Sequence, residues 1–416
     1  MIQTRSPRRK SSAVRQGNLH PAWERVRRYL PLIISVILIL LSIYVRYVTR
    51  AMTNSDMDAH ILPWYAKLQK HGPLLGLGKD FYNYTPPYLY LLALATLTSS
   101  VIAPITSVKL IAMLFDICAA FMIYKIVRLQ RPQGYLPVLA SALFFTGPTM
   151  LANSAVWGQA DSIYTAFLLT CLYFLLVDRP LPAVVFFSIA LAFKPQGIFF
   201  VPLLLVMMLW GKIRWYQLLV VPVVYAICMA PSVAFGRTWQ EVFTLYTSQT
   251  NSGKALTHNA ATVYVFFPRS AYSWLLWPAV LVAVVIFLIW VYYTWRTTRR
   301  RDVPAIILLA LICVTLVPFF LPNMRERYYY PADTISLILA FVAPGLWYVP
   351  ILFQILSMLS YSMFLWAAPQ TYLQAATLIA LFTLILLFRQ QVSLGEPVKA
   401  STPKQARSKA AAMRRA

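Results

Sequence analysis

The sequence of 416 residues contains few charged residues and very few acids. Only 12% of its residues are Asp, Glu, Lys or Arg, and only 12 residues are acidic. Charged residues make up about 25% of a typical soluble domain. Hydrophobic residues account for 60% of this chain, and its mean hydropathy is +0.64. The composition excludes a water-soluble fold and favours an integral membrane protein.

Cysteine is also scarce. All four cysteines lie inside apolar runs and lack the spacing of metal ligands, so we interpret them as small packing residues: Cys118, Cys171, Cys228 and Cys313. The N-terminal region lacks the short apolar core and the small-residue cleavage site of a signal peptide. Its first apolar run, 29–48, is long enough to cross a bilayer, and we expect it to remain as the first transmembrane helix.

Positive charge, by contrast, is abundant, and the formal net charge is +25. Its largest concentrations are two tails, 1–28 and 389–416, that flank the apolar region. Basic flanks mark the cytoplasmic side of a membrane protein and can contact anionic lipid head groups. We therefore expect two cytoplasmic tails, the second of them disordered, around a membrane domain of 29–388. This placement argues against a nucleic-acid partner.

The positive-inside rule, applied to every gap between apolar runs, predicts about twelve transmembrane helices. Two apolar runs, 86–103 and 106–127, precede the basic gap at 125–131. If both crossed the membrane, that gap and every later basic gap would lie outside. We therefore expect an all-α membrane fold in which 86–103 is a re-entrant or interfacial helix of a first outer loop, 49–104. The expected spans are 29–48, 106–127, 134–151, 161–177, 180–194, 197–211, 215–234, 273–295, 303–321, 330–345, 348–366 and 371–388.

This topology places most of the unusual polar residues on one face, in the loops 49–85, 152–160, 194–196, 235–272 and 322–329. The first loop holds the only closely spaced acidic pair, Asp56 and Asp58. A carboxylate there can act as the general base toward an acceptor hydroxyl. A solvated turn is the alternative. The pair could also hold a divalent metal, although two carboxylates alone are a weak metal signal.

The second outer loop combines an aromatic ring, an amide and an acid in Trp157, Gln159 and Asp161. These groups together suit a sugar ring. Trp157 alone could equally anchor the edge of the bilayer. That alternative explains Asp161 poorly, because ionisable groups at membrane depth are costly and tend to be functional.

A lysine and an amide, Lys194 and Gln196, lie on either side of a proline that separates two apolar runs. A cation on the outer face opposes the positive-inside rule. The proline explains the break in the helix, but it does not require a lysine. Attraction to a phosphate or pairing with a loop carboxylate would explain Lys194, and snorkelling to the interface is the alternative.

The last outer loop carries Arg325, Glu326, Arg327 and Tyr328. Two arginines can clamp a phosphate, or Glu326 can neutralise one of them in a structural ion-pair network. The tyrosine could instead belong to an interfacial belt. His258, in the long loop 235–272, is a weaker candidate for substrate binding, because an ordinary hydrogen-bonded loop histidine fits equally well.

As a set, these residues resemble the GT-C superfamily of polytopic glycosyltransferases that use lipid-phosphate sugars. Within it they resemble the bacterial proteins similar to the second GPI mannosyltransferase. The resemblance rests on 157–161, 194–196, 325–328, Ser55 with Asp56, and the segment 84–87. It implies helices lying along the membrane in the first outer loop, and Asp56, or failing that Asp58, as the catalytic base. The family often has histidine where this chain has Arg325, which puts any role of that imidazole in doubt.

The expected function is therefore transfer of a hexose, with inversion, from a polyprenyl-phosphate-sugar donor to a lipid or glycan acceptor on the outer or periplasmic face. The resemblance favours mannose as the sugar and the bacterial cytoplasmic membrane over the endoplasmic reticulum. No cofactor is required by this reading, although a divalent metal stays open. The alternatives are a secondary transporter or lipid flippase, or a noncatalytic scaffold. Transporters place their site between repeated halves near the midplane, and the sequence shows no such repeat.

Overall fold

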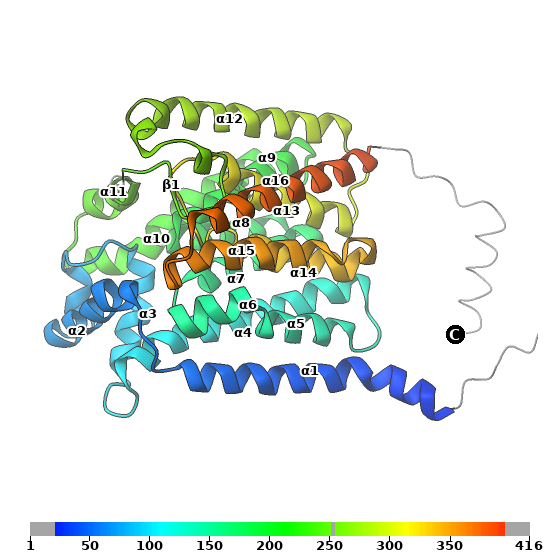
Figure 1. Ribbon diagram of the computed structural model, residues 1–416. Helices are drawn as coiled ribbons and strands as arrows, with labels where there is room; N and C mark the ends of the chain where they lie inside the picture. Colours follow the sequence, from blue (N-terminus) through cyan, green and yellow to red (C-terminus); the bar gives the residue numbers. More distant parts are fainter. Residues whose placement is uncertain (1–20, 251–253, 396–416) are drawn as a thin grey trace, which may run out of the picture.

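The computed structural model describes residues 21–250 and 254–395, which form a helical bundle (Figure 1). Most of the two basic tails expected from the sequence lies outside these residues. The first described helix, α1 (Pro21–Thr49), includes the last residues of the N-terminal tail, and α16 (Gln370–Ser393) includes the first residues of the C-terminal tail. The N-terminal end of α1 and the C-terminal end of α16 lie at the same end of the bundle, on the right of Figure 1.

Seven helices among the described residues are long and apolar enough to cross a membrane. Short 3₁₀ turns lengthen three of them, α10, α12 and α15, at their N-terminal ends. The seven are α1, α4 (Pro104–Gln130), α10 (Val220–Ala234), α12 (Tyr272–Thr297), α13 (Val303–Phe320), α15 (Val349–Leu365) and α16. In α1, only 17% of the apolar window is buried by protein, as expected of a helix that faces lipid, whereas in α13 83% is buried and the helix runs through the core.

An eighth span is formed if a bent pair of helices is counted as one. The first part is α5 (Leu136–Thr146), and the second comprises α6 (Pro148–Met150) and a π-helical turn over Leu151–Trp157. The two parts meet at 48°. Pro148 has no backbone N–H to donate to the preceding turn, which explains the bend. The sequence predicted a loop from residue 152, but the chain stays helical as far as Trp157.

Four shorter apolar helices lie toward the centre of the bundle. They are α7 (Asp161–Leu176), α8 (Pro180–Phe193), α14 (Tyr330–Val342), and α9 (Val201–Leu209) with the 3₁₀ turn Pro195–Phe200 before it. Buried side chains of α7, α8, α9, α13 and α14 form most of the main hydrophobic core. Each expected span coincides with one of these helices or with the bent pair. Because length and composition alone identify seven or eight crossings, the count of twelve stays a prediction.

The remaining elements gather at the end of the bundle opposite the start of α1 and the end of α16, on the left of Figure 1. They include α2 (Leu62–His71), α3 (Pro86–Thr96), α11 (Trp239–Thr250), and a parallel pair of short strands, β1 (Thr257–His258) and β2 (Met324–Arg325). The 11 residues of α3 span about 16 Å, which is about half the thickness of a bilayer core. That length agrees with a helix that does not cross. Whether α3 is re-entrant or interfacial stays a prediction.

Candidate functional site

A polar cavity opens at this end of the bundle. Its empty volume is about 830 Å³, which includes the space at its mouth. Four segments that are far apart in the sequence line it: the segment between α1 and α4, the turn before α7, the break between α8 and α9, and β2 with the turn after it. The lining residues are Asp56, His60, Ile61, Trp64, Asn83, Tyr84, Thr85, Gln159, Phe193, Lys194, Pro195, Gln196, Arg325, Arg327 and Tyr328.

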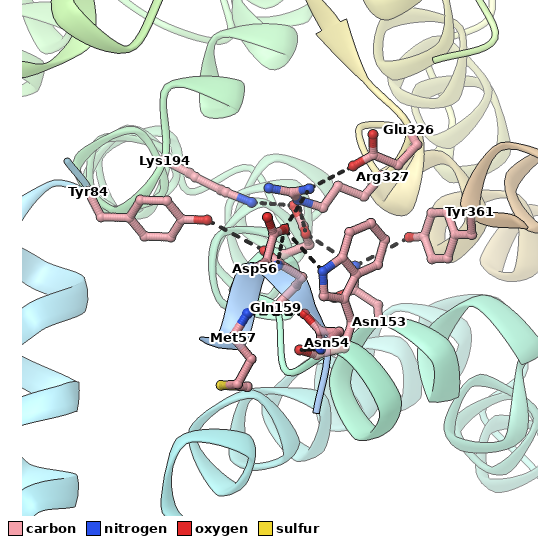
Figure 2. A network of polar contacts seen from close by, with 12 residues as sticks. Asn54, Asp56, Met57, Tyr84, Asn153, Gln159, Lys194, Glu326, Arg327 and Tyr361 are labelled. Atoms are coloured by element: carbon pink, nitrogen blue, oxygen red, sulfur yellow. Dashed lines mark hydrogen bonds and ion pairs between the residues drawn. The ribbon is translucent and has the colours of Figure 1, made fainter. Parts of the chain in front are cut away.

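Asp56 lies at the start of a π-helical turn, and one of its two carboxylate oxygens is held firmly by the protein. Its Oδ2 accepts hydrogen bonds from Trp157 Nε1 at 3.1 Å and from Gln159 Nε2 at 3.0 Å (Figure 2). Its Oδ1 accepts no hydrogen bond from any described residue. The side chain is 21% exposed. One oxygen therefore orients the carboxylate, and the other is left for a ligand in the cavity.

Asn54 fixes the backbone on both sides of this contact. Its Nδ2 donates to the carbonyl of Trp157 at 3.0 Å, and its Oδ1 accepts from the amide of Met57 at 3.1 Å. Between Trp157 and Gln159, Gly158 adopts a left-handed conformation with φ +74°. Residues with a Cβ rarely adopt this conformation, so the glycine allows the turn that points both side chains at Asp56.

Asp161 is a buried carboxylate that binds two cations. Its Oδ1 lies 2.5 Å from Lys194 Nζ, and its Oδ2 lies 3.3 Å from Arg327 Nε. The same Oδ2 accepts a hydrogen bond from Asn153 Nδ2 at 3.1 Å. A buried charge is stable only when it is paired and hydrogen-bonded. Asp161 therefore holds Lys194 and Arg327 at the wall of the cavity, and the pairing that the sequence offered as one explanation of Lys194 is present.

The guanidinium of Arg327 contacts two further acids besides Asp161, namely Glu326 and Asp56 (Figure 2). Its Nη1 lies 2.7 Å from Glu326 Oε1 and 3.7 Å from Asp56 Oδ2. Its plane lies over the indole of Trp157, with 5.1 Å between Cζ and the ring centroid. Its Nη2 donates to no residue in the described part of the chain. Glu326 thus neutralises much of the charge of Arg327, while one edge of the guanidinium remains available.

Arg325 differs from the other cations of the cavity, because it forms no ion pair with a described residue. It lies in β2 and lines the cavity. Parallel pairing with β1 fixes its backbone, and the amide of Glu326 donates to the carbonyl of His258 at 3.1 Å. A charge without a protein partner in a polar cavity is suited to binding an anionic ligand.

His258 belongs to β1 of this strand pair and is not among the residues that line the cavity. Its Nε2 is 2.8 Å from Asn323 Oδ1. Burial lowers the pKa of His258, the nearby charge of Arg325 lowers it further, and the hydrogen bond with Asn323 opposes both. In the folded protein its geometry suits a neutral residue that supports the strand pair.

The structure brings most of the predicted site residues to one place. Seven line the cavity: Asp56, Gln159, Lys194, Gln196, Arg325, Arg327 and Tyr328. Three lie directly against these residues, namely Trp157, Asp161 and Glu326. Asp58 is exposed outside the lining and accepts a hydrogen bond from Thr53. Within 21–250 and 254–395, no three His, Cys, Asp or Glu side chains are grouped as a metal site would require.

Sequence reasoning missed the aromatic wall of the cavity. The ring of Trp64 lies 5.3 Å from that of Tyr84 and 6.0 Å from that of His60, measured between centroids. Tyr84 also reaches Gln159, with its hydroxyl 3.4 Å from Oε1. Aromatic residues near a membrane end are usually interfacial anchors, which hides such a wall in the sequence. The only signal was the position of Tyr84 in the segment 84–87.

An ion pair inside the membrane bundle was also missed. Arg46 Nη1 of α1 lies 2.8 Å from Asp116 Oδ2 of α4. The same nitrogen donates to Ser154 Oγ at 2.8 Å, and the hydroxyl of Tyr330 donates to Asp116 Oδ1 at 3.0 Å. Asp116 lies within an apolar run, and the sequence alone does not identify its partner. This network joins four helical segments that lead to the cavity.

Two comparisons relate the chain to known proteins. The model of glycosyltransferase family 87 matches residues 82–322, more than half of the sequence. The structure is similar to the crystal structure of ArnT from Cupriavidus metallidurans bound to undecaprenyl phosphate, with a TM-score of 0.50 and 14% identity over 86% of this chain and 76% of that one. No curated protein matches the sequence significantly. The narrower resemblance to the second GPI mannosyltransferase therefore stays a hypothesis. The family match and the shared fold agree with the GT-C resemblance of the polar loops. The chain belongs to glycosyltransferase family 87 and is a polytopic membrane enzyme of the GT-C type.

Proposed function

We propose that this enzyme transfers a hexose from a polyprenyl-phosphate-sugar donor to a hydroxyl of a lipid or glycan acceptor, with inversion at the anomeric carbon. Mannose is the proposed hexose, through the family resemblance only. The proposal rests on one observation: Asp56 Oδ1, which accepts no hydrogen bond from a described residue, lies in the same cavity as Arg325, which forms no ion pair with a described residue. Undecaprenyl phosphate in the similar ArnT structure supports a polyprenyl-phosphate carrier.

Asp56 is the proposed general base. Its Oδ1 takes the proton of the acceptor hydroxyl while the acceptor oxygen bonds to the anomeric carbon. The bond between that carbon and the phosphate oxygen breaks, and its electron pair leaves with the lipid phosphate. Hydrogen bonds from Trp157 and Gln159 hold Oδ2, so the orientation of the base is set before the substrate binds.

Arg325 and the open edge of Arg327 are the proposed ligands of the departing phosphate. Fixed cations at the position where negative charge develops stabilise a transition state more than flexible ones do. Strand pairing fixes Arg325, and ion pairs with Glu326 and Asp161 fix Arg327. Lys194 is the third cation at the wall, although Asp161 already neutralises it.

A single displacement fits the distribution of acids. Asp56 is the only carboxylate among the residues that line the cavity, while Asp161 and Glu326 lie behind it in ion pairs. By analogy with glycoside hydrolases, a double displacement would need a second free carboxylate as nucleophile. One base acting once inverts the configuration.

The sugar is proposed to bind against Trp64, Tyr84 and Gln196. The two rings offer apolar faces, and Gln196 Oε1 is buried without a hydrogen-bond partner among the described residues. A hydroxyl of the sugar would satisfy that oxygen. Trp157, Gln159 and Asp161, first expected to hold the sugar, instead position Asp56 and the cations. His258 is proposed to support Arg325 rather than to contact substrate.

The proposed topology has twelve crossings, with α3 as a re-entrant or interfacial helix and the cavity on the outer or periplasmic face of a bacterial cytoplasmic membrane. The helix ends to which the basic tails are joined, at the start of α1 and the end of α16, lie at the opposite end of the bundle and support this orientation (Figure 1). Family membership argues against the transporter and scaffold alternatives. No metal is assigned a role.

The test is transfer by the purified full-length protein in detergent, with polyprenyl-phosphate-mannose and polyprenyl-phosphate-glucose compared as donors and the product analysed by mass spectrometry. Asp56→Asn keeps the shape of the side chain and removes the base, so turnover should fall by about 10²-fold or more. The matched control is Asp58→Asn, which changes an exposed acid on the same loop and should leave turnover unchanged. Undiminished turnover of Asp56→Asn would remove Asp56 from the chemistry.

A further inference from the structure

A lysine of α4 is fully buried, and none of its partners is an acid. Lys109 has 0% relative exposure, and its Nζ donates to the carbonyl of Thr49 at 2.8 Å and to that of Met52 at 2.6 Å. No carboxylate in the described part of the chain forms an ion pair with it. A charged group buried in protein is costly unless it is hydrogen-bonded, so the contacts of Lys109 are required to keep it there.

The two carbonyls explain how the charge is accommodated. Thr49 is the last residue of α1, and Met52 lies in the turn that follows it. The last carbonyls of a helix lack amide partners, and the helix dipole makes this end negative. The carbonyl of Thr49 also accepts from the amide of Met52 at 3.0 Å, so the ammonium of Lys109 binds both ends of this turn and fixes the point where the chain leaves α1. Asp56 follows only four residues after Met52.

The stem of the same lysine packs under the turn that binds Asp56. A Cβ placed on Gly158 would lie 3.2 Å from Lys109 Cγ and 2.5 Å from Met57 Cε. Met57 and the stem of Lys109 thus pack directly against the turn at Gly158, which leaves no room there for a methyl group. On either side of Gly158 are the two donors to Asp56 Oδ2, Trp157 and Gln159.

We propose that Lys109 is a positioning residue. It sets the register between the first outer loop and the Trp157 turn, meaning the position of one relative to the other, and so directs Asp56 Oδ1 into the cavity. The ammonium of Lys109 fixes the start of the first outer loop, and its methylene stem supports the Trp157 turn. Lys109 does not line the cavity and touches no reacting group. The catalytic part of this inference rests on the proposed role of Asp56, whereas the register itself does not.

The experiment compares Lys109→Met with Lys125→Met in the full-length protein. Both changes remove a lysine of α4, but Lys125 is only half-buried, lies toward the other end of the helix and stacks on Tyr173. Hydrogen exchange of the amides in 52–61 is measured by mass spectrometry without substrate. We expect Lys109→Met to exchange about tenfold faster there than the wild type, which corresponds to about 1.4 kcal/mol, and Lys125→Met to match the wild type.

The catalytic readout is the division of the effect between kcat and KM. A misplaced base lowers kcat by about tenfold or more and leaves the KM for the donor unchanged, because the cations of the cavity are intact. In an Asp56→Asn background, Lys109→Met should cause no further loss, whereas a general loss of structure would add to it. Equal exchange of 52–61 in the two lysine variants, or an additive loss with Asp56→Asn, would overturn the proposal.

Two further measurements keep the result interpretable. If Lys109→Met does not fold, Lys109→Gln replaces it, since the shorter, uncharged side chain loses the contacts of the ammonium with the two carbonyls and should raise exchange in 52–61 in the same way. Unchanged exchange in Lys109→Gln would then reject the proposal. If the wild type transfers no sugar at all, the proposed function fails, and the exchange data still decide whether Lys109 sets the register.

Discussion

The indole nitrogen of Trp157 donates to Asp56 Oδ2 across 3.1 Å, although 101 residues separate the two in the chain. This bond joins the loop after α1 to the turn before α7. It also places the ring of Trp157 under the guanidinium of Arg327. One aromatic side chain therefore orients the proposed base and supports a cation of the cavity.

Replacing this indole tests the first of these roles. Trp157→Phe keeps a ring beneath Arg327 but removes the N–H that holds Oδ2. A hydrogen bond to a charged group contributes about 1.5–3 kcal/mol, so kcat should fall by about tenfold or more. Steady-state transfer kinetics measure the effect. Trp347→Phe, at an exposed position, is the control and should behave as the wild type. An unaffected kcat in Trp157→Phe would mean that Asp56 needs no such orientation.

Removing Asp161 should destabilise the protein. Asp161→Asn leaves Lys194 and Arg327 near a neutral amide inside the protein, and loss of one partner of a buried ion pair costs about 3–5 kcal/mol. Thermal unfolding in detergent measures the loss. Asp178→Asn breaks the exposed pair with Lys212 and should cost less than about 1 kcal/mol. Similar shifts in the two variants would show that the cluster around Asp161 is well solvated.

The proposed orientation can be tested by labelling in intact cells. In a background without the native cysteines, Asp58→Cys should react with a membrane-impermeant maleimide added outside. Arg179→Cys, exposed in the turn between α7 and α8, should react only after the cells are lysed. Reaction of both positions in intact cells, or of Arg179→Cys alone, would reverse or abolish the assigned sidedness.

Stability should fall as the medium is made acidic, because of His258. Burial first, and then Arg325, lower the pKa of this histidine below its ordinary 6.5. Below about pH 6.5 the unfolded chain therefore binds a proton that the folded chain resists, so the free energy of unfolding falls as pH falls. Above that pH both states are neutral and the effect vanishes.

Melting temperatures between pH 5 and 8 measure this dependence. The melting temperature of His258→Gln should fall less on acidification than that of the wild type. His71→Gln, at the exposed end of α2, should respond to pH as the wild type does. If wild type and His258→Gln respond identically to pH, His258 is not the group responsible.

Hydropathy and charge placement predicted much of the fold. The helices α4, α7, α8, α10 and α13 begin and end within a few residues of the expected spans, because the limits of an apolar run are set by the bilayer. Helical continuation over Leu151–Trp157 was not predicted, since Asn153 and Ser154 are typical of loops. Hydrogen bonds from Asn153 to Asp161 and from Arg46 to Ser154 compensate these side chains in the interior, and no local pattern reveals such distant partners.

The candidate site was predicted as a set of loops, but not as a set of roles. Sequence placed Lys194, Arg325 and Arg327 among the site residues, yet only coordinates distinguish the paired cations from Arg325. Lys109 was overlooked because, near the start of an apolar run, it resembles a lysine that snorkels to the interface. The pairing of a charge depends on side-chain geometry, which hydropathy does not encode.

The shortness of the central helices has a consequence for substrate access. The 16 residues of α7 extend over about 24 Å, less than the roughly 30 Å of a hydrocarbon core. In the proposed orientation, with the C-terminal end of α7 at the inner boundary, α7 begins at Asp161 below the level of the outer head groups. In the proposed reaction, a sugar on a lipid carrier then enters sideways while its tail remains in the leaflet, whereas a water-soluble acceptor must descend several ångströms into the protein to meet it.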